Sequence, residues 1–182
     1  MADNHCIDRA LVDFDVHALY RALDGQRAGR GLSWNGVARE MWELSAELNA
    51  RRNDHPIAGS TLVNMNRRGA STCQHVLFML RWLGKAPEDF VPGVVVSRKH
   101  ALPRVGADRR LRWSLLEVYA ALDTELGRRG LTWRTVAAEL GCGTSQLTSM
   151  RKLRYAIEIK LAMRIVAWVG RPAADFVYAA EW

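Results

Sequence analysis

The sequence contains few of the residues on which catalysis and metal binding usually depend. Its 182 residues include three cysteines and five histidines, all scattered. The cysteines are odd in number and show no CxxC spacing, which predicts a reducing compartment and not a disulfide framework. No HExxH, GxSxG or phosphate-binding glycine loop occurs. We therefore expect neither an enzyme nor a bound metal or cofactor. The cysteines and histidines are Cys6, Cys73, Cys142, His5, His17, His55, His75 and His100.

Long apolar segments are missing as well. No apolar run approaches the length of about 18 residues that a membrane helix requires, and no secretory hydrophobic region is present at the start. We therefore expect a soluble, cytoplasmic protein without a membrane partner. The composition, with 49% hydrophobic and 25% charged residues, is typical of a chain that buries a core.

What the chain does contain is an internal repeat. Residues 14–41 align without a gap on residues 113–140. The similarity returns downstream, where Arg81-Trp82-Leu83-Gly84 corresponds to Ala167-Trp168-Val169-Gly170. The repeat predicts two copies of one domain, over residues 1–92 and 113–182, joined by a linker over 93–112. The identical positions are Tyr20/Tyr119, Ala22/Ala121, Leu23/Leu122, Asp24/Asp123, Arg30/Arg129, Gly31/Gly130, Leu32/Leu131, Trp34/Trp133, Val37/Val136, Ala38/Ala137 and Glu40/Glu139.

The basic charge is concentrated in this linker. The whole chain carries a net charge of +7. Residues 1–92 hold equal numbers of basic and acidic side chains, whereas residues 93–112 hold six basic residues and Asp108 as the sole acid. This distribution favours a polyanionic partner. Pro103 and Gly106 suit a flexible strap that could follow a phosphate backbone. The linker residues expected to contact DNA are Arg98, Lys99, Arg104, Arg109 and Arg110.

Hydrophobic periodicity is helical throughout, and no strand alternation is convincing. In the second half it predicts a helix over 113–128 that ends at Arg129-Gly130, and a helix over 133–140 with Thr132 as its N-cap. Further helices are expected from Thr144 to about Arg154 and over 156–169. Pro172 marks the start of a short fifth helix. The expected fold class is therefore all-α.

Residues 133–150, WRTVAAELGCGTSQLTSM, have the pattern of a helix-turn-helix. Ala137 is small where two helices would cross, and Gly141 can adopt the positive φ of the turn. Apolar residues fall where the helices would meet the core. This segment resembles the helix-turn-helix of the lambda-repressor-like (Cro/C-repressor, XRE) DNA-binding family along its whole length. The apolar positions are Val136, Leu140, Cys142, Leu147 and Met150.

The resemblance implies two tandem lambda-repressor-like helix-turn-helix domains of about five helices each. It implies a transcriptional regulator that binds double-stranded DNA in the bacterial or phage-type cytoplasm, associated with the nucleoid. In the second half it assigns Thr144, Ser145 and Ser149 to base-facing positions. The phosphate-facing positions are Arg134, Gln146, Arg151, Lys152 and Arg154. The exposed side chains of 144–154 include no acid, as a helix in the major groove requires.

The first half departs from this pattern at the turn, where Trp42 replaces the glycine. An insertion of about 42–57 follows, and its apolar spacing predicts that the second helix extends to about Arg52. The segment GSTLVNM (59–65) then parallels TSQLTSM (144–150). The third helix either still reaches DNA or has become a packing surface. Its base-facing candidates are Ser60, Thr61 and Asn64, and its phosphate-facing candidates are Asn66, Arg67 and Arg68.

Two functions remain open from the sequence. The first is sequence-specific DNA binding, in which the tandem chain acts alone or forms a homodimer on a longer site. The second is a protein-interaction module, such as an antitoxin or adaptor, on a repurposed repressor fold. The operator, the sign of regulation and any small-molecule effector are not encoded in a recognisable pattern.

Overall fold

The computed structural model describes residues 13–53, 55, 57–152 and 156–181. This part of the chain is mostly helical, with one two-stranded antiparallel sheet. None of its helices is long and apolar enough to cross a lipid bilayer. The first half contains α1 (Val16–Gly29), α2 (Trp34–Glu43), α3 (Ala46–Arg52), α4 (Gly59–Arg68), α5 (Cys73–Leu83) and the 3-10 turn η1 (Pro87–Phe90).

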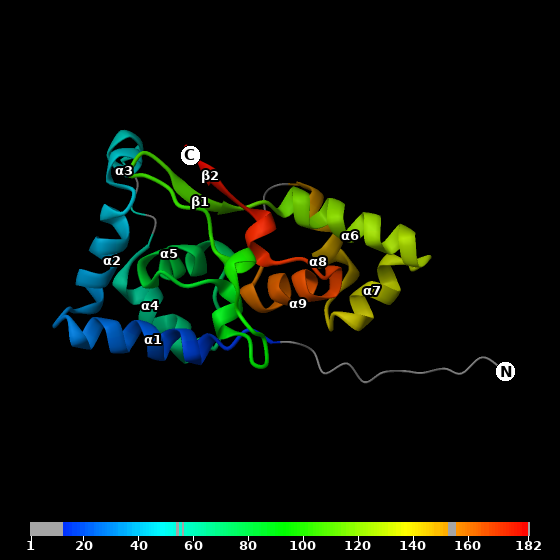
Figure 1. Ribbon diagram of the computed structural model, residues 1–182, viewed down its shortest axis with the longest axis horizontal. Coiled ribbons are helices and arrows are strands. Elements are labelled where there is room, and N and C mark those ends of the chain that lie inside the picture. Colours follow the sequence, from blue (N-terminus) through cyan, green and yellow to red (C-terminus); the bar gives the residue numbers. More distant parts are fainter. Residues whose placement is uncertain (1–12, 54, 56, 153–155, 182) are drawn as a thin grey trace.

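The second half repeats this order without the counterpart of α3. Its elements are α6 (Leu115–Arg129), α7 (Trp133–Glu139), α8 (Thr144–Thr148), η3 (Ser149–Lys152), α9 (Ile159–Val169) and η4 (Ala173–Phe176). Between the halves lie η2 (Arg98–His100) and β1 (Arg110–Trp113), and β1 pairs with the late strand β2 (Val177–Ala180). In Figure 1, α1 and α6 lie on opposite edges of the molecule and run in opposite directions.

The predicted helix boundaries in the second half are largely confirmed. The Thr132 hydroxyl accepts a hydrogen bond from Thr135 N–H and caps α7. Gly130 ends α6 with a φ of 65°, a conformation that costs glycine little because it has no Cβ. Two helices are shorter than predicted: α8 stops at Thr148 and continues as η3, and α9 begins at Ile159. Pro172 precedes η4, a single 3-10 turn, where a short helix was expected.

Two corrections concern the rest of the prediction. The fold is not purely helical, because β1 and β2 pair over four residues each. The second helix does not run unbroken to Arg52, because α2 ends at Glu43 and α3 begins at Ala46. Ser45 interrupts the helix with a φ of −130°, and its hydroxyl donates to Arg109 C=O at 2.7 Å. The interruption thus comes from a contact with the linker.

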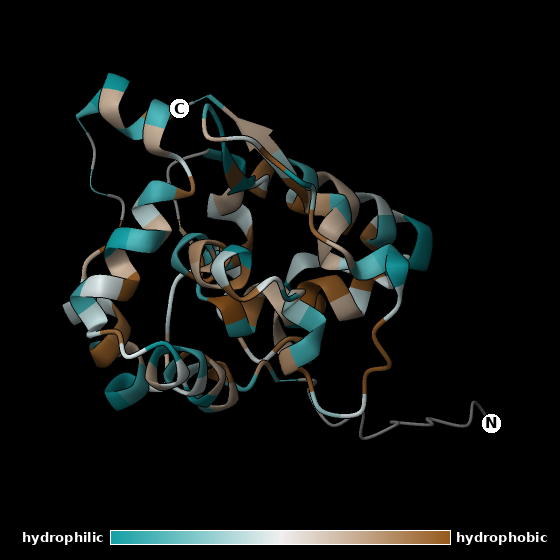
Figure 2. Cartoon of the chain, turned by 60° about the vertical axis from the view of Figure 1, so that its left-hand side comes forward, coloured by the Kyte–Doolittle hydropathy of each residue, from teal (hydrophilic) through white to brown (hydrophobic). Residues whose placement is uncertain are grey.

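The buried apolar side chains form one cluster that includes residues of both halves. Equivalent helices α5 and α9 contact each other at the centre of the molecule. In Figure 2 the hydrophobic residues of the helices (brown) lie mostly towards the interior of the molecule, and the hydrophilic residues (teal) lie mostly on the outside. Aromatic contacts recur as the repeat predicts: the ring centroids of Tyr20 and Trp34 lie 5.0 Å apart, and those of Tyr119 and Trp133 also lie 5.0 Å apart.

Candidate nucleic-acid interface

The turn between α7 and α8 is built by short local interactions. Gly141 has a φ of 63°, as predicted for this glycine. Cys142 N–H donates to Ala137 C=O at 2.9 Å, which folds the chain back over the end of α7. Gly143 N–H donates to Gln146 Oε1 at 2.8 Å and satisfies a free donor at the start of α8. Leu147 and Met150 are fully buried, so the opposite side of α8 and η3 faces solvent.

This outer face is polar and free of acidic residues. Thr144, Ser145, Gln146, Arg151 and Lys152 are exposed, as is Arg134 on α7. Ser149 is half-buried, and its hydroxyl donates to Gln146 C=O at 3.1 Å. Arg154 lies outside the described residues. Two of the predicted contact residues, Gln146 and Ser149, thus already take part in helix-end hydrogen bonds.

In the first half, α4 packs across the start of α2 despite the inserted residues. Gly59 is buried there, and a Cβ built on it would lie 3.0 Å from both Trp34 C and Asn35 N. The insertion that contains α3 therefore does not prevent α4 from packing against α2. Leu62 and Met65 are buried at the positions that correspond to Leu147 and Met150. The two helix pairs thus use equivalent core residues.

The outer face of α4 is also free of acidic residues. Ser60, Arg67 and Arg68 are exposed, whereas Thr61, Asn64 and Asn66 are half-buried. Asn64 Oδ1 accepts a hydrogen bond from Arg67 Nη2 at 3.0 Å. Asn66 Oδ1 lies 3.0 Å from Nδ1 of His17, at the start of α1. Sequence reasoning missed this role of His17, and no spacing signal could have revealed it.

A symmetric backbone bridge joins the two halves next to these helices. Thr72 and Glu158, which are equivalent in the repeat, form an antiparallel bridge. Cys73 N–H donates to Ile157 C=O at 2.9 Å, and Ile159 N–H donates to Ser71 C=O at 2.9 Å. Each bond is the repeat equivalent of the other. The halves are therefore related near this point by an approximate two-fold axis.

Both acid-free helical segments end close in sequence to this bridge. α4 ends at Arg68 and η3 at Lys152, each a few residues before the bridge. The exposed pairs Arg67/Arg68 and Arg151/Lys152 therefore lie on either side of the axis. Each half thus contributes two exposed positive charges, and Glu158 in the bridge itself is an exposed acid.

Comparison with protein-family models, curated proteins and solved structures finds no match to this chain. The geometry of the interface is therefore the basis for any functional conclusion.

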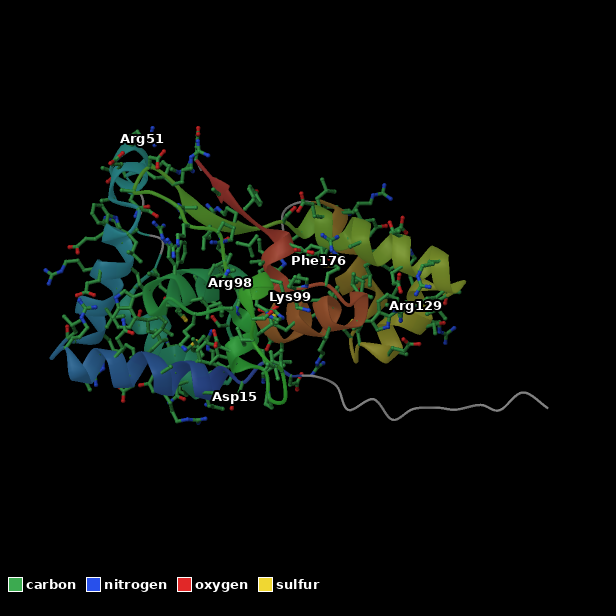
Figure 3. All side chains as sticks on the ribbon, viewed as in Figure 1. Asp15, Arg51, Arg98, Lys99, Arg129 and Phe176 are labelled. Carbon is green, nitrogen blue, oxygen red and sulfur yellow. The ribbon has the colours of Figure 1, made fainter. Side chains whose placement is uncertain are left out.

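The basic linker lies elsewhere on the molecule. Lys99 borders Gly170 and Arg171, at the carboxyl end of α9, whereas Glu158 and the bridge are at its amino end. An 11-residue helix such as α9 is about 16 Å long. Arg98 and Lys99 lie in the middle of the molecule, between the two halves (Figure 3). The part of the linker around Lys99 thus lies near the end of α9 that is remote from the bridge, whereas Leu111 at the end of the linker accepts a hydrogen bond from Gln74 near the start of α5.

The structure corrects the picture of a uniformly flexible strap. Arg98, Lys99 and Arg104 are exposed, as expected. Arg109 is exposed but forms an ion pair with Glu181 at 2.9 Å. Arg110 is only 2% exposed, and its Nη2 donates to Asn49 Oδ1 at 2.7 Å. Arg110 is therefore a packing residue that fixes α3 against β1, and it cannot reach DNA from this position.

Arg81 on α5 holds the linker in place, a role that sequence reasoning missed. Its guanidinium donates to the carbonyl oxygens of Leu44, Val105, Gly106 and Arg109 and to the Ser45 hydroxyl, over distances of 2.5–3.2 Å. Burial lowers the pKa of Arg81 below its usual value. The repeat contains a signal for this role. Ala167 occupies the equivalent position in the second half, so Arg81 departs from the repeated pattern and its role belongs to the first half alone.

Proposed function

We propose that this protein binds double-stranded DNA sequence-specifically and regulates transcription. In this proposal the chain consists of two tandem helix-turn-helix domains, and α4 and the α8–η3 segment enter the major groove. The observation that carries the proposal is the approximate two-fold axis at Thr72 and Glu158, which presents two acid-free helical segments as a symmetric pair.

Symmetry of this kind suits a duplex because the two strands of DNA are themselves related by two-fold axes. Helix-turn-helix proteins commonly bind as dimers on two half-sites about one helical turn apart. Here one chain supplies both helix pairs, so a single molecule would occupy both half-sites. A homodimer of the whole chain is then required only for a longer operator.

The side chains of the interface divide into two groups. Arg67, Arg68, Arg151 and Lys152, with Arg134, would contact phosphates and supply most of the affinity. Ser60, Thr61, Thr144 and Ser145 are short and would read base edges with modest discrimination. Asn64 can pair with adenine after Arg67 releases its Oδ1, and Arg67 is then free to contact a phosphate.

The salt dependence of duplex binding tests this assignment. Fluorescence anisotropy with a labelled random duplex, at several salt concentrations, gives the slope of log K against log salt. Loss of two phosphate contacts should reduce this slope by about 1.8. We therefore expect the double substitution Arg151→Ala/Lys152→Ala to weaken binding to every duplex and to flatten its salt dependence, and Arg67→Ala/Arg68→Ala to do the same.

The matched control is Arg98→Ala/Lys99→Ala, which removes two adjacent exposed charges from the linker. Because these residues lie near the carboxyl end of α9, we expect the slope of this variant to stay close to that of the unaltered protein. If only the linker variant changed the slope, the DNA would lie against the opposite end of α5 and α9. Selection of bound sequences from a random duplex pool then tests whether binding is sequence-specific.

One observation favours the alternative of a protein-interaction module. Val94, Val95 and Val96 are exposed in the loop after η1, and Val95 is 87% exposed. Adjacent exposed apolar residues are typical of surfaces that contact another protein. Absence of duplex binding at low salt, where electrostatic attraction is strongest, would favour this alternative over DNA binding.

A further inference from the structure

A large cavity, the linker cavity, lies between the linker and the end of α5. Linker residues between Val96 and Val105 form one side of it, and the last turn of α5 with the segment up to Asp89 forms the other. Its volume is about 650 Å³. Sites for small molecules in proteins have volumes of roughly 300–1,000 Å³, so the linker cavity is large enough for such a ligand.

Much of the wall of the linker cavity is apolar. Leu80 and Leu111 line it and are buried in the protein. Leu44 and Leu102 also line it and are half-buried. Val96 is 38% exposed, so part of the apolar lining is in contact with water. A ligand with an apolar body can therefore reach this wall and remove apolar surface from water, which favours binding.

The charged residues of the linker cavity are mainly basic. Arg81, Lys85 and Arg104 line it, together with one acid, Asp89. The carboxylate of Asp89 already has partners: Oδ2 accepts a hydrogen bond from Ala86 N–H at 2.8 Å, and Oδ1 lies 3.9 Å from Lys85 Nζ. The balance of charge in the cavity therefore favours an anionic ligand.

Two of these cations have no acidic partner among the described residues. Arg104 is exposed and forms no ion pair with an acid that the structure describes. The guanidinium of Arg81 donates to carbonyl oxygens and to the Ser45 hydroxyl, so no described carboxylate neutralises its charge. Arg104 is therefore available to donate to a ligand, and Arg81 attracts an anion through its charge alone.

We propose that the linker cavity binds an aliphatic monocarboxylate of medium chain length. The carboxylate pairs with Arg104 and Lys85, which are exposed, and the chain lies against Leu44, Leu80 and Leu102. A cavity of about 150 Å³ can hold a benzene-sized molecule, so a chain of about eight carbons fits even though part of the linker cavity is open to solvent. Because the linker and α5 both contact the ligand, binding joins the linker to α5.

The probe that tests this site is octanoate, compared with octan-1-ol, octylammonium and butanoate. Methyl NMR of the full chain, labelled at the leucine methyl groups, follows the Leu102 signal during titration without DNA. We expect octanoate to shift this signal with a Kd on the order of 1 mM. The alcohol and the ammonium ion should each bind at least about fivefold more weakly because they lack the negative charge. Butanoate should bind at least about tenfold more weakly because it buries four methylene groups fewer.

Substitutions at exposed positions separate the site from a general effect on folding or net charge. Lys85→Gln/Arg104→Gln removes two exposed cations of the cavity, and we expect at least about fivefold weaker binding of octanoate. Lys85→Glu/Arg104→Glu should reverse the preference, so that octylammonium binds more tightly than octanoate. The matched control Arg98→Gln/Lys99→Gln removes two exposed linker cations that do not line this cavity and should leave the Kd unchanged.

The proposal is overturned if octanoate and octan-1-ol bind equally, or if the Leu102 signal does not shift at about 20-fold the expected Kd. It is also overturned if Lys85→Gln/Arg104→Gln weakens binding no more than the control does. These outcomes are independent of the proposed duplex binding, because the titration contains no DNA.

Discussion

Trp82 donates a hydrogen bond from its indole Nε1 to Glu40 Oε2 at 2.8 Å, and the repeat reproduces this contact as Trp168 to Glu139 at 2.7 Å. In both halves an arginine guanidinium lies over the tryptophan, Arg30 at 5.7 Å and Arg129 at 4.0 Å from the ring centroid. The interaction joins α2 to α5 in the first half and α7 to α9 in the second. It therefore fixes the angle of α2 relative to α5 and of α7 relative to α9.

The two tryptophans should differ in their contribution to stability. Trp82 is 8% exposed, and Glu40 also accepts two hydrogen bonds from Arg30. We expect Trp82→Phe to lower the free energy of unfolding by about 1–2 kcal/mol, because a hydrogen bond and packing are lost together. The more exposed Trp168→Phe should cost less than about 1 kcal/mol. Urea unfolding measures both, and a larger loss for Trp168→Phe would contradict the reasoning.

Close packing at Gly59 predicts a second result. A methyl group there would overlap with the Asn35 side-chain oxygen and would also press on backbone atoms of Trp34 and Asn35, which cannot rotate away. We expect Gly59→Ala to destabilise the protein by about 2 kcal/mol through overpacking. Gly25→Ala in α1 is the control: apart from the chain neighbours of Gly25 and the backbone of its own helix, no described atom lies within 4 Å of the point that its Cβ would occupy, so higher helix propensity should stabilise the protein by up to about 1 kcal/mol. Equal effects of the two substitutions on thermal unfolding would argue against close packing of α4 on α2.

Removal of the Arg81 side chain should loosen the linker. Arg81→Ala leaves several carbonyl oxygens without their donor, and we expect a loss of about 2 kcal/mol in the free energy of unfolding. Trypsin should then cleave more rapidly at Lys99 and Arg104, which both precede the segment over 105–109 that Arg81 holds. Arg81→Lys restores the charge but not the five donors, so its cleavage rate should stay close to that of Arg81→Ala. Cleavage as slow as in the unaltered protein would show that other contacts hold the linker.

His75 should make stability depend on pH. Burial lowers the pKa of its imidazole in the folded protein. The unfolded chain therefore binds a proton more readily, and stability is lost as the pH falls from about 6.5 towards the folded pKa. His75→Gln should reduce this loss, and His55→Gln at an exposed position is the control. Urea titrations at pH 7.5, 6.5 and 5.5 make the comparison, and identical pH dependence in all three proteins would refute the role of His75.

The sequence predicted features that depend on local chemistry. Thr132 as an N-cap, Gly130 as a helix end and Gly141 as the turn residue are confirmed, because capping and positive φ depend on a few adjacent residues. The core positions Val136, Ala137, Leu147 and Met150 are buried as the helix-turn-helix pattern requires.

Features that depend on distant contacts could not be predicted in this way. β1 and β2 have four residues each, too few for a visible alternation, and they pair across most of the second half of the chain. The break at Ser45 could not be predicted because it contains no glycine or proline. It is stabilised by the hydrogen bond of the Ser45 hydroxyl to Arg109 C=O and by the contacts of Arg81. Arg110 was expected on the surface because an arginine in a basic segment is usually solvated. Its bond to Asn49, 61 positions earlier in the sequence, places it inside.

The bridge between Thr72 and Glu158 has a consequence for how the two halves can diverge. In a homodimer every mutation occurs on both sides of the axis, and dilution separates the subunits. Here the halves share one polypeptide, so their association does not depend on concentration, and each half can accumulate its own substitutions. The contact of His17 with Asn66 and the inserted α3 belong to the first half alone. A fused pair of this kind can therefore lose its symmetry one residue at a time while its central contact remains.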